Sequence, residues 1–240
     1  MELLTQQDVL AHQAEVPWPS LRQVEQDLVL CRAMAAIFND RFLGEQVAMR
    51  GGTLLHKVYL APPSRFSEDI DLVVFGDRPE DHIRKALRRV LAEVLGSPKT
   101  SVWNTINLAV RNAVRPSRIL RMTYAVPPVI EQGPALQIVV EVNVTERTSH
   151  SSIAKLPFEF PFRRNSISMS INGYEIHEML GTKMRALFQR RRGRDLFDLF
   201  WALERGTPPV DSEAVVDSFL YYLRQEGAQP VREEFITILN

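Results

Sequence analysis

The chain of 240 residues has one cysteine, no long apolar run and no net charge, because 29 basic and 29 acidic residues balance. A single cysteine excludes an internal disulfide, and Cys31 lies in an apolar helical pattern typical of core packing. No apolar run approaches the ~20 residues that span a bilayer, and the N-terminus lacks the pattern of a signal peptide. We therefore expect a cytoplasmic protein with no membrane partner, whose ligands are indicated only by local charge clusters.

Several common enzyme motifs are missing as well. The five histidines show neither HExxH nor zinc-ligand spacing, there is no G-x-G-x-x-G, and the GTK of residues 181–183 lacks P-loop spacing. Zinc hydrolases, dinucleotide enzymes and kinases are therefore disfavoured. The chain is 45% hydrophobic and 24% charged, which is typical of a globular protein with one core or with a smaller second domain.

Hydrophobic periodicity divides the chain into a mixed part and a helical part. In the mixed part we expect helices over residues 19–43, 53–60 and 79–96, and strands over 45–50, 67–75, 101–110, 118–126 and 136–144. The helical part has predicted helices over 175–189, 194–204, 212–225 and 232–239. The expected fold class is α/β (α+β), with a mixed sheet core and N-terminal helices over residues 1–170 and a helical C-terminal domain over residues 171–240.

Asp69 and Asp71 lie two residues apart on a predicted strand. Both carboxylates therefore project from one face, while Ile70 and Leu72 face the other. Two adjacent carboxylates repel each other unless a cation lies between them. Mg²⁺ takes a few carboxylates together with water and phosphate oxygens, so the pair suits a metal–nucleotide site. A solvated strand end is the alternative explanation of the same two residues.

A glycine pair stands upstream of this strand. A strand followed by Gly51, Gly52 and a helix that begins at Thr53 directs backbone N–H groups and a hydroxyl at one point, which is a site for an anion. Lys57 lies four residues after Thr53 on the same helix face, within reach of a phosphate. A tight turn followed by a solvated lysine is the alternative.

Glu141 is the third acidic candidate. Four aliphatic residues of its predicted strand share one face, which leaves Glu141 beside Asn143 on the other. If this strand neighbours the Asp69 strand, Glu141 completes a three-carboxylate site able to hold two metal ions. On an edge strand it is a solvated side chain instead.

Charged residues also gather where two predicted helices meet. Asp195 and Asp198 share a helix face, and either an ion pair with Lys183 or Arg185 or a nucleotide contact explains them. A basic cluster just before them is either a solvated helix end or a surface for RNA phosphates. The cluster consists of Arg190, Arg191, Arg192 and Arg194.

A glycine turn, a helix with a lysine, D-x-D and a later strand with a third acid resemble the DNA polymerase β nucleotidyltransferase superfamily. Within it, RGGTLLHKVY (residues 50–59) and RFSEDIDL (residues 65–72) closely resemble the AbiEii-type toxin nucleotidyltransferases of bacterial toxin–antitoxin systems. That family also has a helical lysine and an R-D-x-x-D segment, matched here by Lys183 and residues 194–198. The resemblance spans residues 50 to about 200, with Glu141 where an aspartate is common and no assigned motif after residue 205.

The resemblance implies transfer of a nucleoside monophosphate from an NTP to an acceptor, with Mg²⁺ or Mn²⁺ as cofactor. It implies metal ligation by Asp69, Asp71 and Glu141, and catalytic roles for Lys183 and Asp195, with Lys183 neutralising charge on the phosphates. The implied nucleotide-binding residues are Gly51, Gly52, Thr53, Lys57, Arg65, Ser67 and Asp198. An RNA, notably a tRNA 3′ end, is the implied acceptor, and a cognate antitoxin is the implied partner.

Two other functions fit the same residues. A small-molecule nucleotidyltransferase of the antibiotic-modifying kind has the same core, and an arginine patch beside the cleft would favour RNA over it. A catalytically silent nucleotide-binding or antitoxin-like module would bind nucleotide without releasing pyrophosphate.

Overall fold

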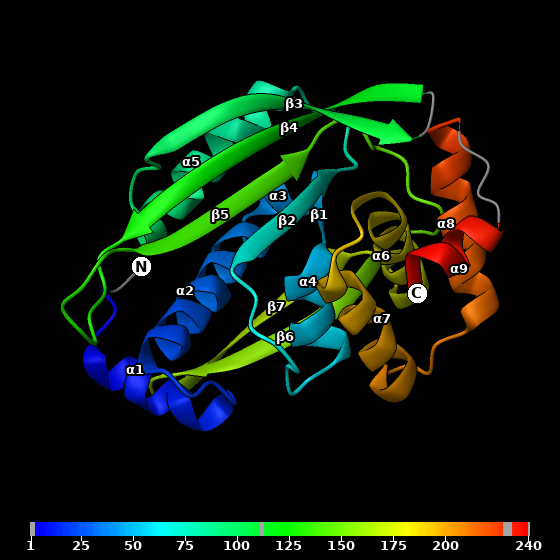
Figure 1. Ribbon diagram of the computed structural model, residues 1–240. Helices are drawn as coiled ribbons and strands as arrows, with labels where there is room; N and C mark the ends of the chain where they lie inside the picture. The colour runs from blue at the N-terminus through cyan, green and yellow to red at the C-terminus, as the bar shows by residue number, and fades with distance from the viewer. Residues whose placement is uncertain (1–2, 111–112, 228–231, 240) are drawn as a thin grey trace.

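The chain folds around a mixed seven-stranded sheet, which a computed structural model describes over residues 3–110, 113–227 and 232–239. The strand order is β3-β4-β5-β2-β1-β7-β6 (Figure 1). Neighbouring strands are antiparallel except in two parallel pairs, β2 with β5 and β1 with β7. The strands are β1 Val47–Arg50, β2 Asp69–Val74, β3 Thr100–Val110, β4 Ala113–Val126, β5 Leu136–Asn143, β6 Ala154–Phe162 and β7 Asn165–Gly173.

Helices form two groups around the sheet. Helices α2 and α5 pack together behind β4 and β5 in Figure 1, whereas α6, α7 and α8 lie together on the right of the view. The first group and its neighbours are α1 Gln6–His12, the 3₁₀ turn η1 Gln13–Glu15, α2 Leu21–Phe38, α3 Arg41–Gly44, α4 Gly51–Leu54, the π-helical turn η2 Leu55–Tyr59 and α5 Glu80–Leu95. The second group is α6 Ile176–Arg190, α7 Gly193–Arg205, α8 Ser212–Gln225 and α9 Arg232–Leu239.

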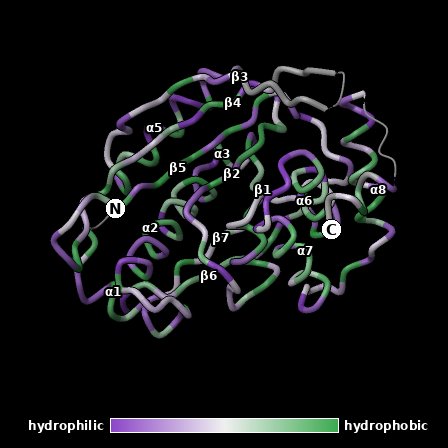
Figure 2. Tube along the Cα trace, in the orientation of Figure 1, coloured by the Kyte–Doolittle hydropathy of each residue, from purple (hydrophilic) through white to green (hydrophobic). Residues whose placement is uncertain are grey.

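The central strands separate an apolar face from a polar one. Ile70, Leu72, Val140 and Val142 are buried in one hydrophobic core cluster with residues of α2 and α5. Hydropathy alternates along the amphipathic helices in Figure 2, as expected for helices with one face on this core. The opposite face of β2 and β5 is left for the acidic residues.

Most of the predicted elements are confirmed, with differences that have local causes. The helix expected over residues 19–43 breaks into α2 and α3 because Asp40 caps a new turn, accepting a hydrogen bond from the Leu43 N–H. The helix expected over residues 53–60 is a short α4 that widens into η2. Strands β6 and β7 were not predicted. The two prolines of β6 weaken its strand signal, and they are tolerated because β6 is an edge strand.

The proposed boundary near residue 170 stays a prediction. The main core cluster includes Tyr174, Met179 and Tyr222 together with side chains of the sheet, so apolar packing continues across that position. No helix among the described residues is long and apolar enough to cross a membrane.

Candidate active site

Two acids meet at the centre of the sheet. Strand β5 lies parallel to β2, in a register that places Glu141 beside Asp71. The condition set by the sequence for a three-carboxylate group is therefore met, because Asp69 lies two residues before Asp71 on the same face. The same register continues outward to Arg50 on β1 and Arg121 on β4, which gives a row of four charged residues across four strands.

The acids open into a cavity of about 780 Å³ between the sheet and the helices α6 and α7. Of the predicted site residues, the structure brings nine to its wall: Gly51, Gly52, Arg65, Ser67, Asp69, Asp71, Glu141, Lys183 and Asp195. Thr53, Lys57 and Asp198 are predicted site residues that do not line it. The cavity is thus built from both the sheet and the helical part of the chain.

Burial and neighbouring carboxylates raise the pKa of two of these acids, Asp69 and Glu141. Burial, followed by the charges of Asp71 and Glu141, raises the pKa of Asp69 to about 6. Burial and Asp71 also raise the pKa of Glu141, against the opposing effect of Arg121. The three carboxylates repel one another when they are ionised and no cation is bound. As oxygen ligands they suit Mg²⁺ or Mn²⁺, which would relieve this repulsion.

Glycines 51 and 52 let the backbone approach the acids closely. Gly51 has a φ of +83°, and a Cβ atom there would collide with the carboxylate of Asp71. A Cβ atom on Gly52 would lie 2.5 Å from Nη2 of Arg65. Gly51 therefore requires glycine for reasons of space and of backbone conformation, whereas a side chain at Gly52 would have to displace the end of Arg65.

The expected nucleotide contact of Thr53 is corrected by the structure. Its side chain is fully buried, and its Oγ1 lies 2.6 Å from Oγ of Ser67 and 2.5 Å from the carbonyl oxygen of Asp69. The hydroxyl therefore fixes the segment that leads into β2 and is not directed at an anion. Sequence alone placed the residue next to the glycines but could not show which way its hydroxyl points.

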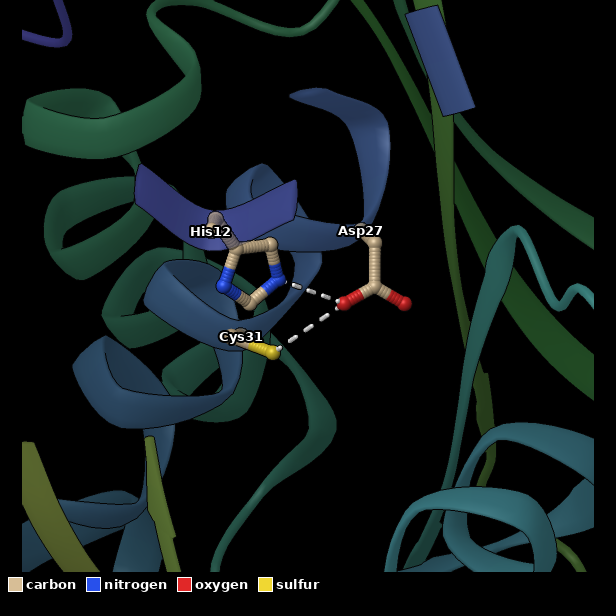
Figure 3. A group of neighbouring side chains, drawn as sticks. All are labelled: His12, Asp27 and Cys31. Atoms are coloured by element: carbon tan, nitrogen blue, oxygen red, sulfur yellow. Dashed lines mark hydrogen bonds and ion pairs between the residues drawn. The ribbon is translucent and has the colours of Figure 1, made fainter. Parts of the chain in front are cut away.

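Lys57 is corrected in the same way, since it lies in a buried cluster away from the cavity. Its Nζ lies 2.7 Å from Oδ1 of Asp27 and 3.4 Å from Sγ of Cys31. The other carboxylate oxygen of Asp27 lies 3.0 Å from Nε2 of His12 (Figure 3). Burial opposes the charge on Asp27, yet Lys57 and His12 hold the pKa of that carboxyl well below its usual range.

His12, Asp27 and Cys31 together have the ligand types of a metal site, with their ligand atoms within 4.8 Å of one another. The ammonium of Lys57 already supplies the positive charge that Asp27 requires. Burial also raises the pKa of the Cys31 thiol to about 12, so it is not a thiolate at neutral pH. We therefore interpret this cluster as a structural ion pair.

Asp198 connects the helical part to the cavity wall from behind. Its carboxylate is fully buried and lies 2.9 Å from Nζ of Lys183 and 2.9 Å from Nε2 of His56. Arg65 contacts both of its oxygens, at 2.7 Å each. Although burial opposes its charge, Arg65, His56 and Lys183 keep the pKa of Asp198 far below its usual range. The expected nucleotide contact of Asp198 is thus replaced by a positioning role for two cavity cations, while Asp195 lies 3.3 Å from Lys183 at the wall itself.

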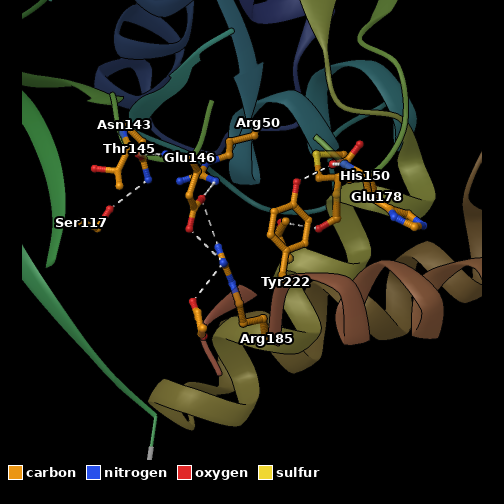
Figure 4. Close-up of polar contacts among 12 residues, drawn as sticks. Arg50, Ser117, Asn143, Thr145, Glu146, His150, Glu178, Arg185 and Tyr222 are labelled. Carbon is orange, nitrogen blue, oxygen red and sulfur yellow. Dashed lines mark hydrogen bonds and ion pairs between the residues drawn. The ribbon is translucent and has the colours of Figure 1, made fainter. Parts of the chain in front are cut away.

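A second set of ion pairs joins β1, the segment after β5 and α6 at the cavity wall (Figure 4). Glu146 contacts Nη1 of Arg50 at 2.5 Å and Nη1 of Arg185 at 2.9 Å, and Arg185 also contacts Glu226 at 3.1 Å. Burial opposes the charge of Glu146, but the two arginines lower its pKa to about 2. Glu146 carries no motif in the sequence, so only the fold reveals it.

The basic cluster at the junction of α6 and α7 lies at the cavity mouth. All four of its arginines are exposed, and Arg190, Arg192 and Arg194 line the cavity. Arg191 ends α6 in a left-handed conformation, with a φ of 51°, and turns the chain into α7. An arginine patch beside the cleft is the feature that was expected to favour an RNA acceptor over a small molecule.

A mixed sheet that presents three carboxylates beside a glycine turn is the arrangement of a nucleotidyltransferase. The family model described as nucleotidyl transferase AbiEii toxin of type IV toxin–antitoxin systems matches residues 32–239. The chain therefore belongs to the AbiEii family of toxin nucleotidyltransferases, as the sequence motifs predicted.

A solved structure of a nucleotidyltransferase toxin has the same fold. MenT4, the nucleotidyltransferase toxin Rv2826c from Mycobacterium tuberculosis H37Rv, superposes with a TM-score of 0.62 at 17% identity, over 98% of this chain and 77% of that one. An antigenic nucleotidyltransferase-like protein from Paracoccidioides brasiliensis gives a TM-score of 0.39 at 15% identity, over 89% of this chain and 92% of the other. None of the curated proteins matches the sequence significantly.

Proposed function

We propose that this toxin transfers a nucleoside monophosphate from an NTP to RNA, with a tRNA 3′ end as acceptor, in a reaction that depends on Mg²⁺ or Mn²⁺. The observation that carries the proposal is the register of β2 and β5, which gathers Asp69, Asp71 and Glu141 at one cavity wall. Such a toxin acts in the cytoplasm, where its substrates are, and is countered by a cognate antitoxin.

We propose that the three acids bind the metal ions and that one of them also accepts a proton. Asp69, Asp71 and Glu141 hold the divalent cations, and Glu141 also takes the proton from the attacking hydroxyl. When bound, the cations neutralise the carboxylates and phosphate oxygens and so lower the barrier to phosphoryl transfer. Gly51 leaves room for Asp71 to keep its position beside the backbone turn.

The cations on the helical side are proposed to bind the triphosphate. Arg65 and Lys183 face the cavity and are held from behind by Asp198, so they are in place before nucleotide arrives. Lys183 opposes the charge that grows on the leaving pyrophosphate. Ser67 and Asp195 support the same wall, Ser67 through Thr53 and Asp195 through Lys183.

RNA is the proposed acceptor because of where the positive charge lies. The chain has no net charge, yet the exposed arginines of the basic cluster gather at the cavity mouth. Phosphate groups of a nucleic acid provide the complementary charge in a row. A small-molecule acceptor does not require such a patch at the cavity mouth.

Transfer is tested by incubating the enzyme with each labelled NTP, Mg²⁺ and total RNA, with Asp71→Asn as the inactive control. We expect label on RNA and release of pyrophosphate. Label on small molecules instead would favour the antibiotic-modifying kind of enzyme. Nucleotide binding without pyrophosphate release would support the silent module and contradict the proposal.

A further inference from the structure

Arg121 occupies a position that no motif explains. Its Nη1 lies 2.7 Å from Oε1 of Glu141, its direct neighbour on the adjacent antiparallel strand. Asp71 lies on the other side of Glu141, in the parallel register of β2 and β5. Glu141 is therefore placed between a cation on one side and a like charge on the other.

The ion pair between Arg121 and Glu141 is open to water and can be replaced readily by other partners. The Arg121 side chain is 48% exposed and that of Glu141 is 28% exposed. An ion pair this accessible to water contributes little to stability, because solvent screens it. Arg50, at the other end of the row, differs because it is 17% exposed and held by Glu146.

The guanidinium of Arg121 and a divalent metal ion would compete for the carboxylate of Glu141. When a metal ion is bound by Asp69, Asp71 and Glu141, it neutralises the charge that attracts Arg121. The guanidinium then remains at the wall of an anion-binding cavity with its ion pair weakened. A phosphate group is the ligand that a guanidinium binds with matching geometry.

The side of the cavity on which Arg121 lies indicates which phosphate it meets. Ser117, Ile119 and Arg121 occupy alternate positions of β4 and line the cavity from that strand. Strands β5 and β2 separate this wall from Arg65 and from the glycine turn that follows β1. The β4 wall is thus on the far side of the acids from the proposed triphosphate subsite, and we assign it to the acceptor.

We propose that Arg121 is the counter-ion of Glu141 in the metal-free enzyme and that metal binding redirects it to a phosphate of the acceptor. The inference rests on the proposed function and adds an order of ligand binding to it. Metal and nucleotide bind first, and acceptor affinity rises as a result. Arg121 is in this sense a positioning residue for Glu141 before metal binds and an acceptor ligand afterwards.

The first test measures Mn²⁺ affinity by electron paramagnetic resonance, without nucleotide or RNA. Arg121→Gln should bind Mn²⁺ about fivefold more tightly than wild type, because an exposed competing ion pair is lost. Arg121→Lys, which keeps the charge, should stay close to wild type. The matched control is Arg118→Gln, since Arg118 is on the same strand but stacks on Trp103 and contacts Glu80 instead.

The second test measures the affinity of each protein for a single-stranded RNA oligonucleotide, with and without saturating Mn²⁺. Wild type and Arg118→Gln should gain affinity with Mn²⁺, whereas Arg121→Gln should gain about threefold less, as expected for the loss of one phosphate contact. In steady state, Arg121→Gln should raise KM for the acceptor and leave KM for NTP unchanged, and Arg121→Lys should restore part of the loss.

Two results separate this inference from the proposed function. If Mn²⁺ binds wild type and not Asp71→Asn, but Arg121→Gln has wild-type Mn²⁺ affinity, the role of Arg121 is overturned and the metal site stands. If Asp71→Asn binds Mn²⁺ as well as wild type does, the metal site is elsewhere and both proposals fail.

Discussion

Asp198 on α7 holds Arg65, 133 residues earlier in the chain, through two contacts of 2.7 Å each. The same carboxylate contacts Lys183 at 2.9 Å, so one buried acid fixes two cations of the cavity wall. Parallel contacts of this kind restrict the guanidinium in direction as well as position. The cations that we propose to bind the triphosphate are therefore in position before any nucleotide binds. These side chains then need no reorganisation during the reaction.

Lys183→Ala should lower the rate of transfer at saturating NTP about 100-fold and weaken NTP binding much less, because the lysine meets charge that grows in the transition state. The melting temperature should change little, since Asp198 keeps Arg65 and His56 as partners. Single-turnover kinetics and thermal melts measure the two effects. Lys155→Ala, an exposed lysine on β6, is the control. A large loss of melting temperature with normal activity of the folded fraction would show a purely structural ion pair.

Asp71→Asn should abolish transfer, with a loss of at least about 1000-fold, while the fold stays intact. Removing this charge relieves the repulsion that raises the pKa of Asp69, so the metal-free protein should melt at the same temperature or higher. Differential scanning calorimetry and the labelled-NTP assay measure the two quantities. Activity retained with Mg²⁺ would remove Asp71 from the site.

Reversing two charges of the basic cluster should flatten the salt dependence of RNA binding. For Arg190→Glu with Arg192→Glu, the slope of log affinity against log salt should fall by about 1.4, as expected for two contacts to single-stranded RNA. NTP affinity should hardly change, and the variant should be tolerated in cells in which wild type slows growth. Lys85→Glu with Arg88→Glu makes the same change of charge on exposed residues of α5. Equal labelling of RNA by the variant and wild type across a salt series would favour a small-molecule acceptor.

Lys57→Met should destabilise the protein without affecting its chemistry. The change leaves Asp27 buried without its strongest partner, which costs about 3–5 kcal/mol. Urea unfolding should show this loss, and the folded fraction should bind NTP as wild type does. The double variant with Asp27→Asn should recover part of the stability. Weakened NTP binding at full stability would return Lys57 to the nucleotide site.

The ionisation of Glu146 should make the free energy of unfolding depend on pH. Its pKa is lowered from 4.5 to about 2 in the fold, so its contribution is present above pH ~4.5 and is lost as the pH falls towards 2. The shift corresponds to about 3 kcal/mol, at about 1.4 kcal/mol for each pH unit. Glu146→Gln should be less stable than wild type at pH 7, and the difference should shrink as the pH falls from 5 to 2. Chemical unfolding at a series of pH values measures it, and a constant difference would contradict this account.

How far the sequence predicts this site depends on the range of the interactions. Asp69, Asp71 and the glycines were predicted because a strand and a turn fix their directions within a few residues. Glu141 needed one further fact, the pairing of β5 with β2, which local patterns do not contain. Lys57 was misplaced because helical spacing gives the side on which a lysine lies but not the partner that it finds.

Other features depend on contacts between distant segments. Arg121 and Glu146 have no pattern of their own, and their partners come from other strands and from α6. The fold was predicted where periodicity is strong, as in α5 and β2. It was missed in β6, where two prolines weaken the strand signal.

The cavity takes its walls from two separate stretches of the chain, residues 50–146 and residues 182–195. A fragment that ends near residue 170 keeps the three acids and the glycine turn but loses Lys183, Arg185 and Asp198. The remaining fragment has Lys183 and Arg185 and none of the three acids, while Arg65 stays with the first fragment. Glu146 and Arg185 form one of the contacts that join them. Because neither fragment contains the whole cavity wall and one hydrophobic core spans the division, we expect the site to form only when both stretches fold together.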